Sequence, residues 1–189
     1  MEIMDEDIRQ CLRVLSTGGI ILYPTDTVWG IGCDATNSSA VERIFHLKQR
    51  RDDKAMIVLV SDEQTVLNYV NQPDPRIFEY LKKAKKPTTV VYDGAKQLAA
   101  NLSSDGTIGI RICRDPFCQK LLQACGKPLV STSANVSGHA TPVTFHDIPK
   151  EIVDGVDYVV NYRRDDISPA SPSSVVRWTK EHSIEVLRP

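Results

Sequence analysis

Two hydroxyl-rich segments carry the residue types and spacing most suited to chemistry. Residues 24–32 read Pro-Thr-Asp-Thr-Val-Trp-Gly-Ile-Gly directly after a short apolar run, and residues 131–138 read Ser-Thr-Ser-Ala-Asn-Val-Ser-Gly after another. Ligands of open α/β sheets bind beyond the carboxyl ends of strands, so these hydroxyls could donate to phosphate or carboxylate oxygens. The alternative is that they only satisfy the backbone of their own turns.

Lys48 lies where the hydrophobic pattern predicts burial. It follows Val41, Ile44 and Phe45 on one face of a predicted helix, at the end of the apolar stripe. A lysine directed along the core side of a helix usually has an anionic partner or binds a ligand. The alternative is a cation that only complements the carboxyl end of its helix.

Arg111 lies inside a strand-like run at residues 107–113. If the alternating isoleucines of this run face one side of the sheet, Arg111 shares the other side with Thr107 and Gly109. Such small neighbours leave room for a carboxylate or phosphate to bind the guanidinium through two hydrogen bonds. A surface arginine on a half-exposed sheet is the alternative.

Several catalytic signatures are absent from the sequence. Gly30-x-Gly32 lacks the third glycine of a dinucleotide-binding turn, and residues 131–138 lack the glycine–lysine spacing of a P-loop. No Gly-x-Ser-x-Gly nucleophile elbow occurs, and a separation of six residues does not establish Ser133 and His139 as nucleophile and base. The four histidines show no ligand spacing, so we expect no metal chelated wholly by protein side chains.

Alternating helix-period and strand-period segments must position these residues. We predict helices at about 8–15, 38–48, 61–70, 75–84 and 116–125, and strands at 20–23, 55–60, 88–92, 107–113, 128–131, 157–161, 174–178 and 184–187. The closing strands have no helix between them, so some pairs must be antiparallel. The pattern therefore indicates an α/β fold with a mixed sheet rather than a wholly parallel one.

Composition limits the classes of protein. The 189 residues are 41% hydrophobic and 25% charged, which argues against long disorder, and we assign residues 1–189 to one domain. The formal net charge is −1, so any site for a polyanion must be local. The basic run at residues 82–86 is either a solvated face or a tRNA contact.

The cysteines and the amino terminus bear on the compartment. Five cysteines, an odd number without a C-x-x-C pair, indicate reduced and mostly packed thiols in a cytosolic protein. No apolar run approaches the roughly 18 residues of a membrane span. The first residues are acidic, where a signal peptide would be basic and then apolar. We therefore predict a cytoplasmic protein without a membrane segment.

Taken together, five ordered motifs resemble those of the YrdC-like family of L-threonylcarbamoyl-AMP synthases, in its short single-domain form. They are the Pro-Thr-acidic-Thr-Val-aromatic-Gly region at 19–35, the Lys-x-Arg segment at 44–54, the arginine-bearing strand at 107–111, the Ser-Ala-Asn loop at 133–138 and the late strand at 172–176. Three features depart from the family pattern: Arg51 replaces a proline, Ala55-Met56 replaces Pro-Leu, and residues 85–89 replace a Trp-Pro-Gly-Pro segment.

The resemblance implies an open twisted mixed sheet, flanked by helices around a deep basic concavity. It also implies a reaction that joins L-threonine, bicarbonate and ATP into threonylcarbamoyl-AMP, with release of pyrophosphate, for the threonylcarbamoyladenosine modification of tRNA. Mg²⁺ would accompany ATP without dedicated protein ligands. The product would pass to a downstream threonylcarbamoyl transferase, and direct contact with tRNA or double-stranded RNA is possible.

The resemblance also implies roles for individual residues. Thr25, Arg111, Ser131 and Ser173 would surround threonine, and Lys48, Arg50, Thr107, Ser133, Asn135 and Thr141 would lie along the nucleotide, with Lys54 and Thr89 as further candidates. Lys48 and Arg50 would be the catalytic cations that neutralise charge developing on the phosphates.

Two other readings stay open at this point. One is a YciO-like paralogue, a branch that tends to lose the Lys-x-Arg arrangement, which is intact here as Lys48-Gln49-Arg50. The other is a module that binds double-stranded RNA or tRNA without chemistry, for which affinity would depend steeply on salt concentration. The oligomeric state and the identity of any general base are open as well.

Overall fold

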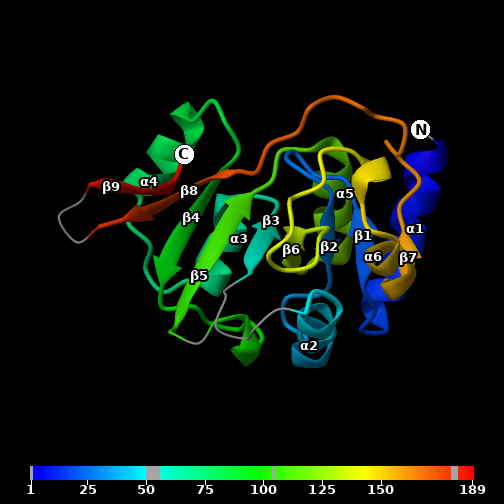
Figure 1. The fold of residues 1–189 in the computed structure, drawn as a ribbon. Coiled ribbons are helices and arrows are strands. Elements are labelled where there is room, and N and C mark those ends of the chain that lie inside the picture. The colour runs from blue at the N-terminus through cyan, green and yellow to red at the C-terminus, as the bar shows by residue number, and fades with distance from the viewer. Residues whose placement is uncertain (1, 50–55, 104, 180–182) are drawn as a thin grey trace.

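Strands from both halves of the chain join one sheet in the computed structural model, which describes residues 2–49, 56–103, 105–179 and 183–189. Within those residues the strand order is β7-β1-β2-β6-β3-β5-β4-β8-β9 (Figure 1). The strands are β1 (Ile21–Tyr23), β2 (Gly30–Gly32), β3 (Ile57–Val60), β4 (Thr88–Asp93), β5 (Thr107–Ile112), β6 (Leu129–Ser133), β7 (Tyr158–Val159), β8 (Ser174–Trp178) and β9 (Ile184–Arg188).

The sheet is mixed, as the sequence pattern predicts. Strand β3 runs parallel to β5, β1 to β7 and β4 to β8, and the other neighbours are antiparallel. The closing pair β8–β9 is antiparallel because only a short connection joins the two strands. Strands β7 and β9 form the two edges, so the sheet is open.

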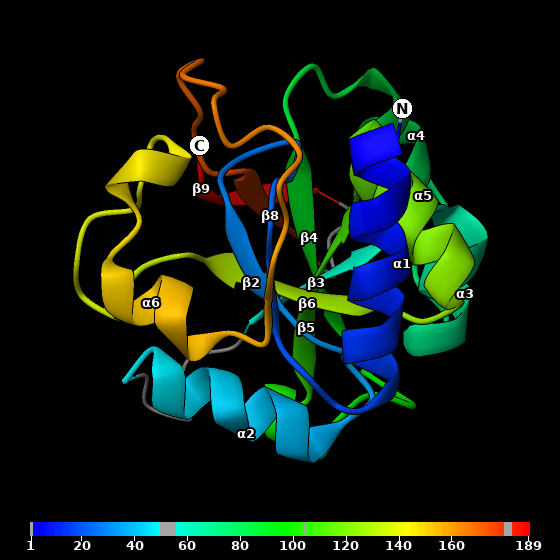
Figure 2. The same cartoon turned by 90° about the vertical axis from the view of Figure 1, so that its right-hand side faces the viewer.

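Helices cover the two faces of the sheet unequally. They are α1 (Glu2–Ser16), α2 (Ser38–Leu47), α3 (Glu63–Tyr69), α4 (Arg76–Lys83), α5 (Pro116–Cys125) and α6 (Lys150–Gly155), with 3₁₀ turns η1 (Ala100–Leu102) and η2 (Phe145–Asp147). In Figure 2, α1, α3, α4 and α5 lie on one side of the sheet, α2 lies across its lower end and α6 lies on the opposite side. None of the described helices is long and apolar enough to span a bilayer.

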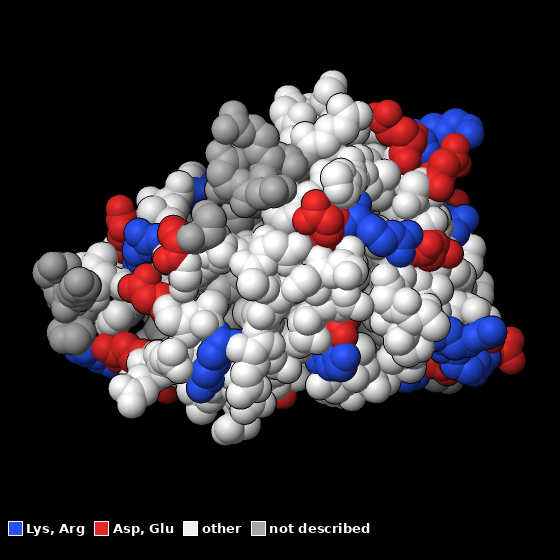
Figure 3. Space-filling model, turned by 90° about the horizontal axis from the view of Figure 1, so that it is seen from below, with Lys and Arg blue, Asp and Glu red and all other residues white. Residues whose placement is uncertain are grey.

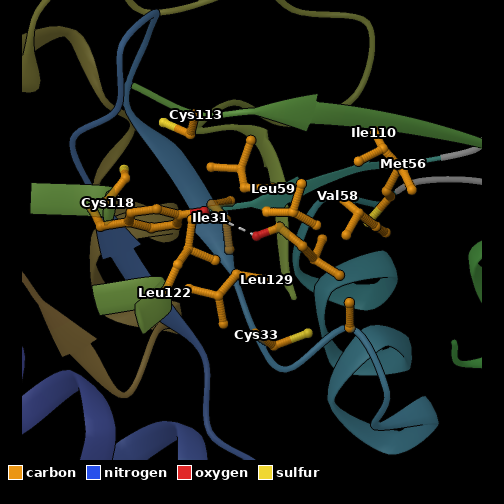
Figure 4. Close-up of a cluster of buried hydrophobic side chains, with 14 of the residues drawn as sticks. Ile31, Cys33, Met56, Val58, Leu59, Ile110, Cys113, Cys118, Leu122 and Leu129 are labelled. Carbon is orange, nitrogen blue, oxygen red and sulfur yellow. Dashed lines mark hydrogen bonds between the residues drawn. The ribbon is translucent and has the colours of Figure 1, made fainter. Parts of the chain in front are cut away.

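The main core lies between the sheet and the helices of the first side. Figure 4 shows Leu129 of β6 beside Leu122 of α5, and Val58 of β3 near Ile110 of β5. All four side chains are almost completely buried. The α/β prediction is confirmed, because the apolar positions of the strands and helices meet in one contiguous cluster.

The cysteines are packed thiols. All five are free, and Cys11, Cys33, Cys113 and Cys118 are buried while Cys125 is partly exposed. Burial raises the pKa of the Cys11 and Cys33 thiols to about 12, with nearby carboxylates adding to the shift. The prediction of mostly packed thiols is confirmed by this arrangement.

Three elements were not predicted from the sequence: β2, α6 and the second half of β6. Residues 24–32 were interpreted as one turn, yet Gly30–Gly32 pairs with β1 and β6. Glycine is rare in strands, but here it is required: a Cβ on Gly32 would lie 2.5 Å from Val130 O and 2.6 Å from Cε1 of Tyr23. The Tyr23 ring crosses this glycine, and its hydroxyl donates to Val130 O at 3.1 Å.

Candidate functional site

A cavity of about 420 Å³ lies on the face of the sheet that the core isoleucines of β5 do not occupy. Alternation along β5 creates it, since Ile108 and Ile110 enter the core while Thr107, Gly109 and Arg111 line the cavity. Residues from β2, β3, β4, β6, β8 and β9 complete the lining. We call this cavity the sheet pocket. The predicted orientation of Arg111 is confirmed.

Cross-strand rows form the floor of the sheet pocket. In one row Gly109 of β5 lies opposite Val91 of β4, which lies opposite Arg177 of β8. In the next row Thr89 lies opposite Val175. The side chains in the middle of both rows are small. They leave the space above the sheet open, and the longer side chains around the cavity face that space.

Arg111 is held from one side. Its exposed fraction is 3%. Its Nη2 donates to Thr27 Oγ1 at 3.2 Å and lies 3.1 Å from Asp26 Oδ1. Its Nε has no hydrogen-bond acceptor among the described residues. The guanidinium therefore keeps a donor for a ligand in the pocket while Asp26 fixes its position.

The serines predicted to contact threonine also line the sheet pocket, one from β6 and the other from the position just before β8. Ser131 and Ser173 are both buried lining residues. The Ser173 hydroxyl lies 2.8 Å from Thr89 Oγ1, and Arg188 donates to the Ser173 carbonyl through Nε at 3.0 Å and Nη2 at 2.9 Å.

Thr25 is buried and is not among the lining residues of the sheet pocket. Its hydroxyl donates to Val28 O at 2.8 Å and accepts from the backbone N–H of Thr27 at 3.0 Å. The side chain thus holds the turn that brings Thr27 to the pocket wall. For Thr25 the contacts match the alternative in which a hydroxyl satisfies its own turn, and its contact with threonine stays a prediction.

Lys48 is buried at the end of α2, as its position in the apolar stripe predicts, with an exposed fraction of 1%. Its ammonium donates to the carbonyls of Ser133 and Asn135, the latter at 2.6 Å. The Lys48 carbonyl in turn accepts from the backbone N–H of Ser137 at 2.9 Å. Lys48 therefore joins α2 to the Ser-Ala-Asn loop, and its role toward phosphate stays a prediction.

The other predicted nucleotide residues fall into three groups. Thr107, Ser133 and Thr141 line the sheet pocket. Asn135 is buried, and its amide donates within the loop to Val136 O at 2.9 Å and His139 O at 2.8 Å. Arg50 and Lys54 lie outside the described residues.

Sequence reasoning gave no site role to several residues of the pocket, among them Thr27, Arg177 and Arg188. A signal for Arg177 was present, because counting in steps of two from Ser173 along a strand places both residues on the same face. Arg188 had no such signal, because only the pairing of β9 with β8 brings it opposite Val175. Burial, and then the positive charge of Arg111, lower the pKa of the Arg188 guanidinium.

The charge of the sheet pocket has one sign. Its lining, as far as the structure describes it, contains three arginines and no aspartate or glutamate. Nor does the described part of the chain hold a group of three or more His, Cys, Asp or Glu side chains suited to a metal ion. Hydroxyls and guanidiniums together can bind carboxylate and phosphate oxygens, so a small anionic ligand fits this chemistry.

Comparison with known proteins assigns the chain to a family. The Sua5/YciO/YrdC model, described as telomere recombination, matches residues 13–189. The chain belongs to this family. Among its curated relatives, the threonylcarbamoyl-AMP synthase of Pseudoalteromonas translucida is 34% identical, covering 82% of this chain and 84% of the relative. The enzyme of the same name from Vibrio campbellii is 28% identical, covering 95% of this chain and 97% of the relative.

Solved structures of the Sua5/YciO/YrdC family share the fold. Escherichia coli YciO superposes with a TM-score of 0.82 at 27% identity, covering 96% of this chain and 87% of that one. Sua5 of P. abyssi in complex with L-threonine superposes with a TM-score of 0.83 at 22% identity, and this chain spans 53% of its length. The expected open mixed sheet flanked by helices is therefore confirmed, and the deep basic concavity stays a prediction.

Proposed function

We propose that this chain is an L-threonylcarbamoyl-AMP synthase, a nucleotidyltransferase that forms threonylcarbamoyl-AMP and pyrophosphate from L-threonine, bicarbonate and ATP. The observation that carries the proposal is the sheet pocket, in which the described lining combines buried hydroxyls with three arginines and contains no carboxylate. The curated relatives named threonylcarbamoyl-AMP synthase support it, because they match this chain over most of its length.

The threonine end of the pocket is the side of Arg111. Its unpaired Nε is suited to the carboxylate of an amino acid, and the buried hydroxyls of Ser131 and Ser173 are suited to its amine and side-chain hydroxyl. The complex of Sua5 with L-threonine shows that a protein of this fold binds that amino acid.

The nucleotide end is the side of Thr107, Ser133 and Thr141. Their hydroxyls are donors for phosphate and ribose oxygens. We keep Lys48 and Arg50 as the catalytic cations and Asn135 as a further nucleotide residue. For Lys48 the contact with the Ser-Ala-Asn loop adds a second role, in which it positions Ser133.

The chemistry needs positioning and charge stabilisation rather than a protein nucleophile. The amine of threonine adds to bicarbonate and loses water to give a carbamate. A carbamate oxygen then attacks the α-phosphorus of ATP, and the bond to the β-phosphate oxygen breaks as pyrophosphate leaves. A carbamate forms weakly and reverts in water, so a closed pocket must hold it. Cations on the phosphates stabilise the charge that develops in the attack.

Mg²⁺ enters the proposal as part of the substrate, bound to the phosphates of ATP. Mg²⁺ is commonly bound through substrate phosphates together with water. We further propose that residues 1–189 act as one catalytic domain in the cytoplasm and that the product passes to a downstream threonylcarbamoyl transferase.

Contact with tRNA or double-stranded RNA is a separate part of the proposal. The basic run at residues 82–86 is its candidate surface. Lys82 already pairs with Glu79 at 3.0 Å and Glu63 at 3.6 Å, so Lys83, Lys85 and Lys86 would supply most of the attraction. Contacts between these exposed lysines and RNA phosphates would weaken as salt concentration rises, so the RNA affinity would fall.

Release of pyrophosphate from ATP tests the proposed function. Purified protein is supplied with Mg·ATP, bicarbonate and one amino acid at a time. We expect a strong requirement for L-threonine, with L-serine poorer by roughly tenfold because one methyl group is missing from the pocket contact. Omission of bicarbonate should abolish the signal. Failure of threonine to raise pyrophosphate above a heat-inactivated control would reject the synthase.

A YciO-like role is the second candidate, because the likeness to Escherichia coli YciO covers 87% of that chain. The intact Lys48-Gln49-Arg50 sequence favours the synthase. The same assay separates the two, since a paralogue without this activity gives no threonine-dependent pyrophosphate. A pure RNA-binding module would give none either, and would instead bind RNA with a steep dependence on salt.

A further inference from the structure

Arg177 is an arginine of the sheet pocket to which neither the sequence motifs nor the comparisons give a role. It lies on β8 between Val176 and Trp178, and alternation directs it to the pocket face. Its Nε is buried and has no hydrogen-bond acceptor among the residues that the structure describes. A buried donor without a partner is unfavourable, and an incoming acceptor would remove that penalty.

The three pocket arginines differ in what already holds them. Arg111 contacts Asp26 and Thr27, and Arg188 donates to the Ser173 carbonyl. For Arg177 the described part of the structure contains neither a hydrogen bond nor an ion pair. Its cross-strand neighbour on β9, Glu185, is exposed and forms no ion pair with it in that part of the chain. Arg177 is therefore the arginine whose charge is least compensated.

The sheet register places Arg177 toward the nucleotide end. Arg177 shares a row with Gly109 and Val91, whereas Arg188 lies opposite Val175 in the next row. Two residues along a strand correspond to roughly 6.6 Å. On β5 one such step leads from Arg111 to Gly109 and a second step leads to Thr107, so the row of Arg177 lies one step from Arg111 toward Thr107. Gly109 has no side chain to fill the space in front of it.

We propose that Arg177 binds a phosphate group of the nucleotide in the sheet pocket. Guanidinium groups pair with phosphate oxygens through two parallel hydrogen bonds, which would satisfy the buried Nε together with one terminal nitrogen. The inference rests on the proposed function in that it takes the ligand of this end of the pocket to be ATP. It adds a phosphate contact to the cations already named.

Binding of Mg·ATP, measured by calorimetry without threonine and bicarbonate, tests the proposal apart from turnover. We expect Arg177→Gln to raise the Kd for ATP by about tenfold, as for loss of one charge-assisted hydrogen bond, with Arg177→Lys intermediate. Adenosine and L-threonine should bind as to the wild type. The matched control is Arg13→Gln, which removes the same charge from an exposed site on α1, far from the pocket lining.

The outcomes separate the inference from the proposed function. An unchanged ATP affinity in a folded Arg177→Gln variant would overturn the inference. An equal loss of affinity for adenosine would overturn it as well, because it would indicate that Arg177 contacts the nucleoside rather than a phosphate. An equal loss in Arg13→Gln would overturn it too, since the effect would be long-range charge. If ATP binding depends on Arg177 but threonine releases no pyrophosphate, the inference stands and the synthase is rejected. If the wild type binds no ATP, both are rejected.

Discussion

Lys48 is a buried cation whose partners include main-chain oxygens, those of Ser133 and Asn135. The charge of its ammonium strengthens both hydrogen bonds relative to neutral ones. Because the bonded carbonyls belong to the loop that carries Ser133 to the sheet pocket, stability and activity are coupled at this residue.

Lys48→Met should therefore lower both properties. The free energy of unfolding should fall by about 3 kcal/mol, since two charge-assisted hydrogen bonds are lost, although the Ser133 carbonyl keeps the backbone N–H of Asn135 as a donor. Threonine-dependent pyrophosphate release should fall more than tenfold when it is measured at a temperature at which the variant is still folded. Urea unfolding and the turnover assay measure the two effects. In the control Lys150→Met, whose side chain is 88% exposed, both should stay near wild type.

Arg50→Ala separates phosphate neutralisation from loop positioning. The proposed role of Arg50 is to stabilise charge in the transition state, so turnover should fall more than tenfold, as for removal of one transition-state cation. Steady-state kinetics at saturating ATP and threonine measure it. Wild-type turnover in both Arg50→Ala and Lys48→Met, each with its fold retained, would refute the assignment of these residues as catalytic cations.

Among the elements, α1 is docked by one buried carboxylate. Asp7 is fully buried and accepts hydrogen bonds from the Tyr158 hydroxyl at 2.6 Å and from the backbone N–H groups of Asn161 and Tyr162. These donors come from β7 and the segment that follows it. The carboxylate thus links the first helix to an edge of the sheet.

Asp7→Asn should weaken this link. An amide offers one acceptor oxygen where the carboxylate offers two, and its NH₂ would face the N–H donors of Asn161 or Tyr162. We expect a loss of about 3 kcal/mol in the free energy of unfolding. Asp5→Asn on the same helix is the control, because Asp5 is partly exposed and pairs with the exposed Lys120. An equal, small effect of both substitutions would contradict the docking role.

Strand β2 depends on a glycine for a steric reason. Gly32→Ala would place a methyl group against Val130 O and the Tyr23 ring. We therefore expect the free energy of unfolding to fall by about 3 kcal/mol. Gly126→Ala is the comparison, since nothing lies within 4 Å of its Cβ and only its φ of +66° opposes a side chain, at a cost of about 1 kcal/mol. Chemical denaturation measures both. If Gly32→Ala lowers the free energy of unfolding by less than Gly126→Ala does, the packing among β1, β2 and β6 must rearrange at little cost to accept a methyl group.

At the scale of the molecule, positive and negative side chains are mixed over the surface. On the face seen in Figure 3, Lys and Arg lie beside Asp and Glu rather than in a field of one sign. This agrees with the net charge of −1. Attraction for a polyanion therefore has to arise locally, as in the sheet pocket with its three arginines.

The mixed charges also predict how stability depends on pH. Burial alone would raise the pKa of Asp34, but hydrogen bonds from Lys127 and Thr36 outweigh it and lower the pKa below the usual 3.8. The Arg43 guanidinium likewise lowers the pKa of Asp157. A carboxylate whose pKa is lower in the folded state stabilises the protein above its unfolded pKa and loses that effect as pH falls.

We therefore expect the urea midpoint to be steady near neutral pH and to decrease below about pH 4. Urea titrations between pH 7 and pH 3 measure this decrease. Asp34→Asn should lower the midpoint at pH 7 and flatten part of the acid decline. If the urea midpoint of that variant decreases with acid as much as that of the wild type, the Asp34 contacts do not contribute to the pH dependence of stability.

Much of the fold and part of the site could be predicted because they depend on local pattern. The period of the apolar residues determined the helix and strand types, the burial of Lys48 and the side of the sheet that Arg111 faces. The resemblance of the motifs named the family, and Ser131, Ser133 and Ser173 do line one pocket.

Other features were decided only by the tertiary structure, since they depend on contacts between residues distant in the sequence. The pairing with β1 and β6 decides that Gly30–Gly32 is a strand, and the ring of Tyr23 and the carbonyl of Val130 decide that position 32 is glycine. The pairing of β8 with β4 and β9 decides that Arg177 and Arg188 share the pocket with Arg111. A sequence pattern encodes which face of an element is buried, but the neighbour against which that face packs is selected by the free energy of the whole assembled core.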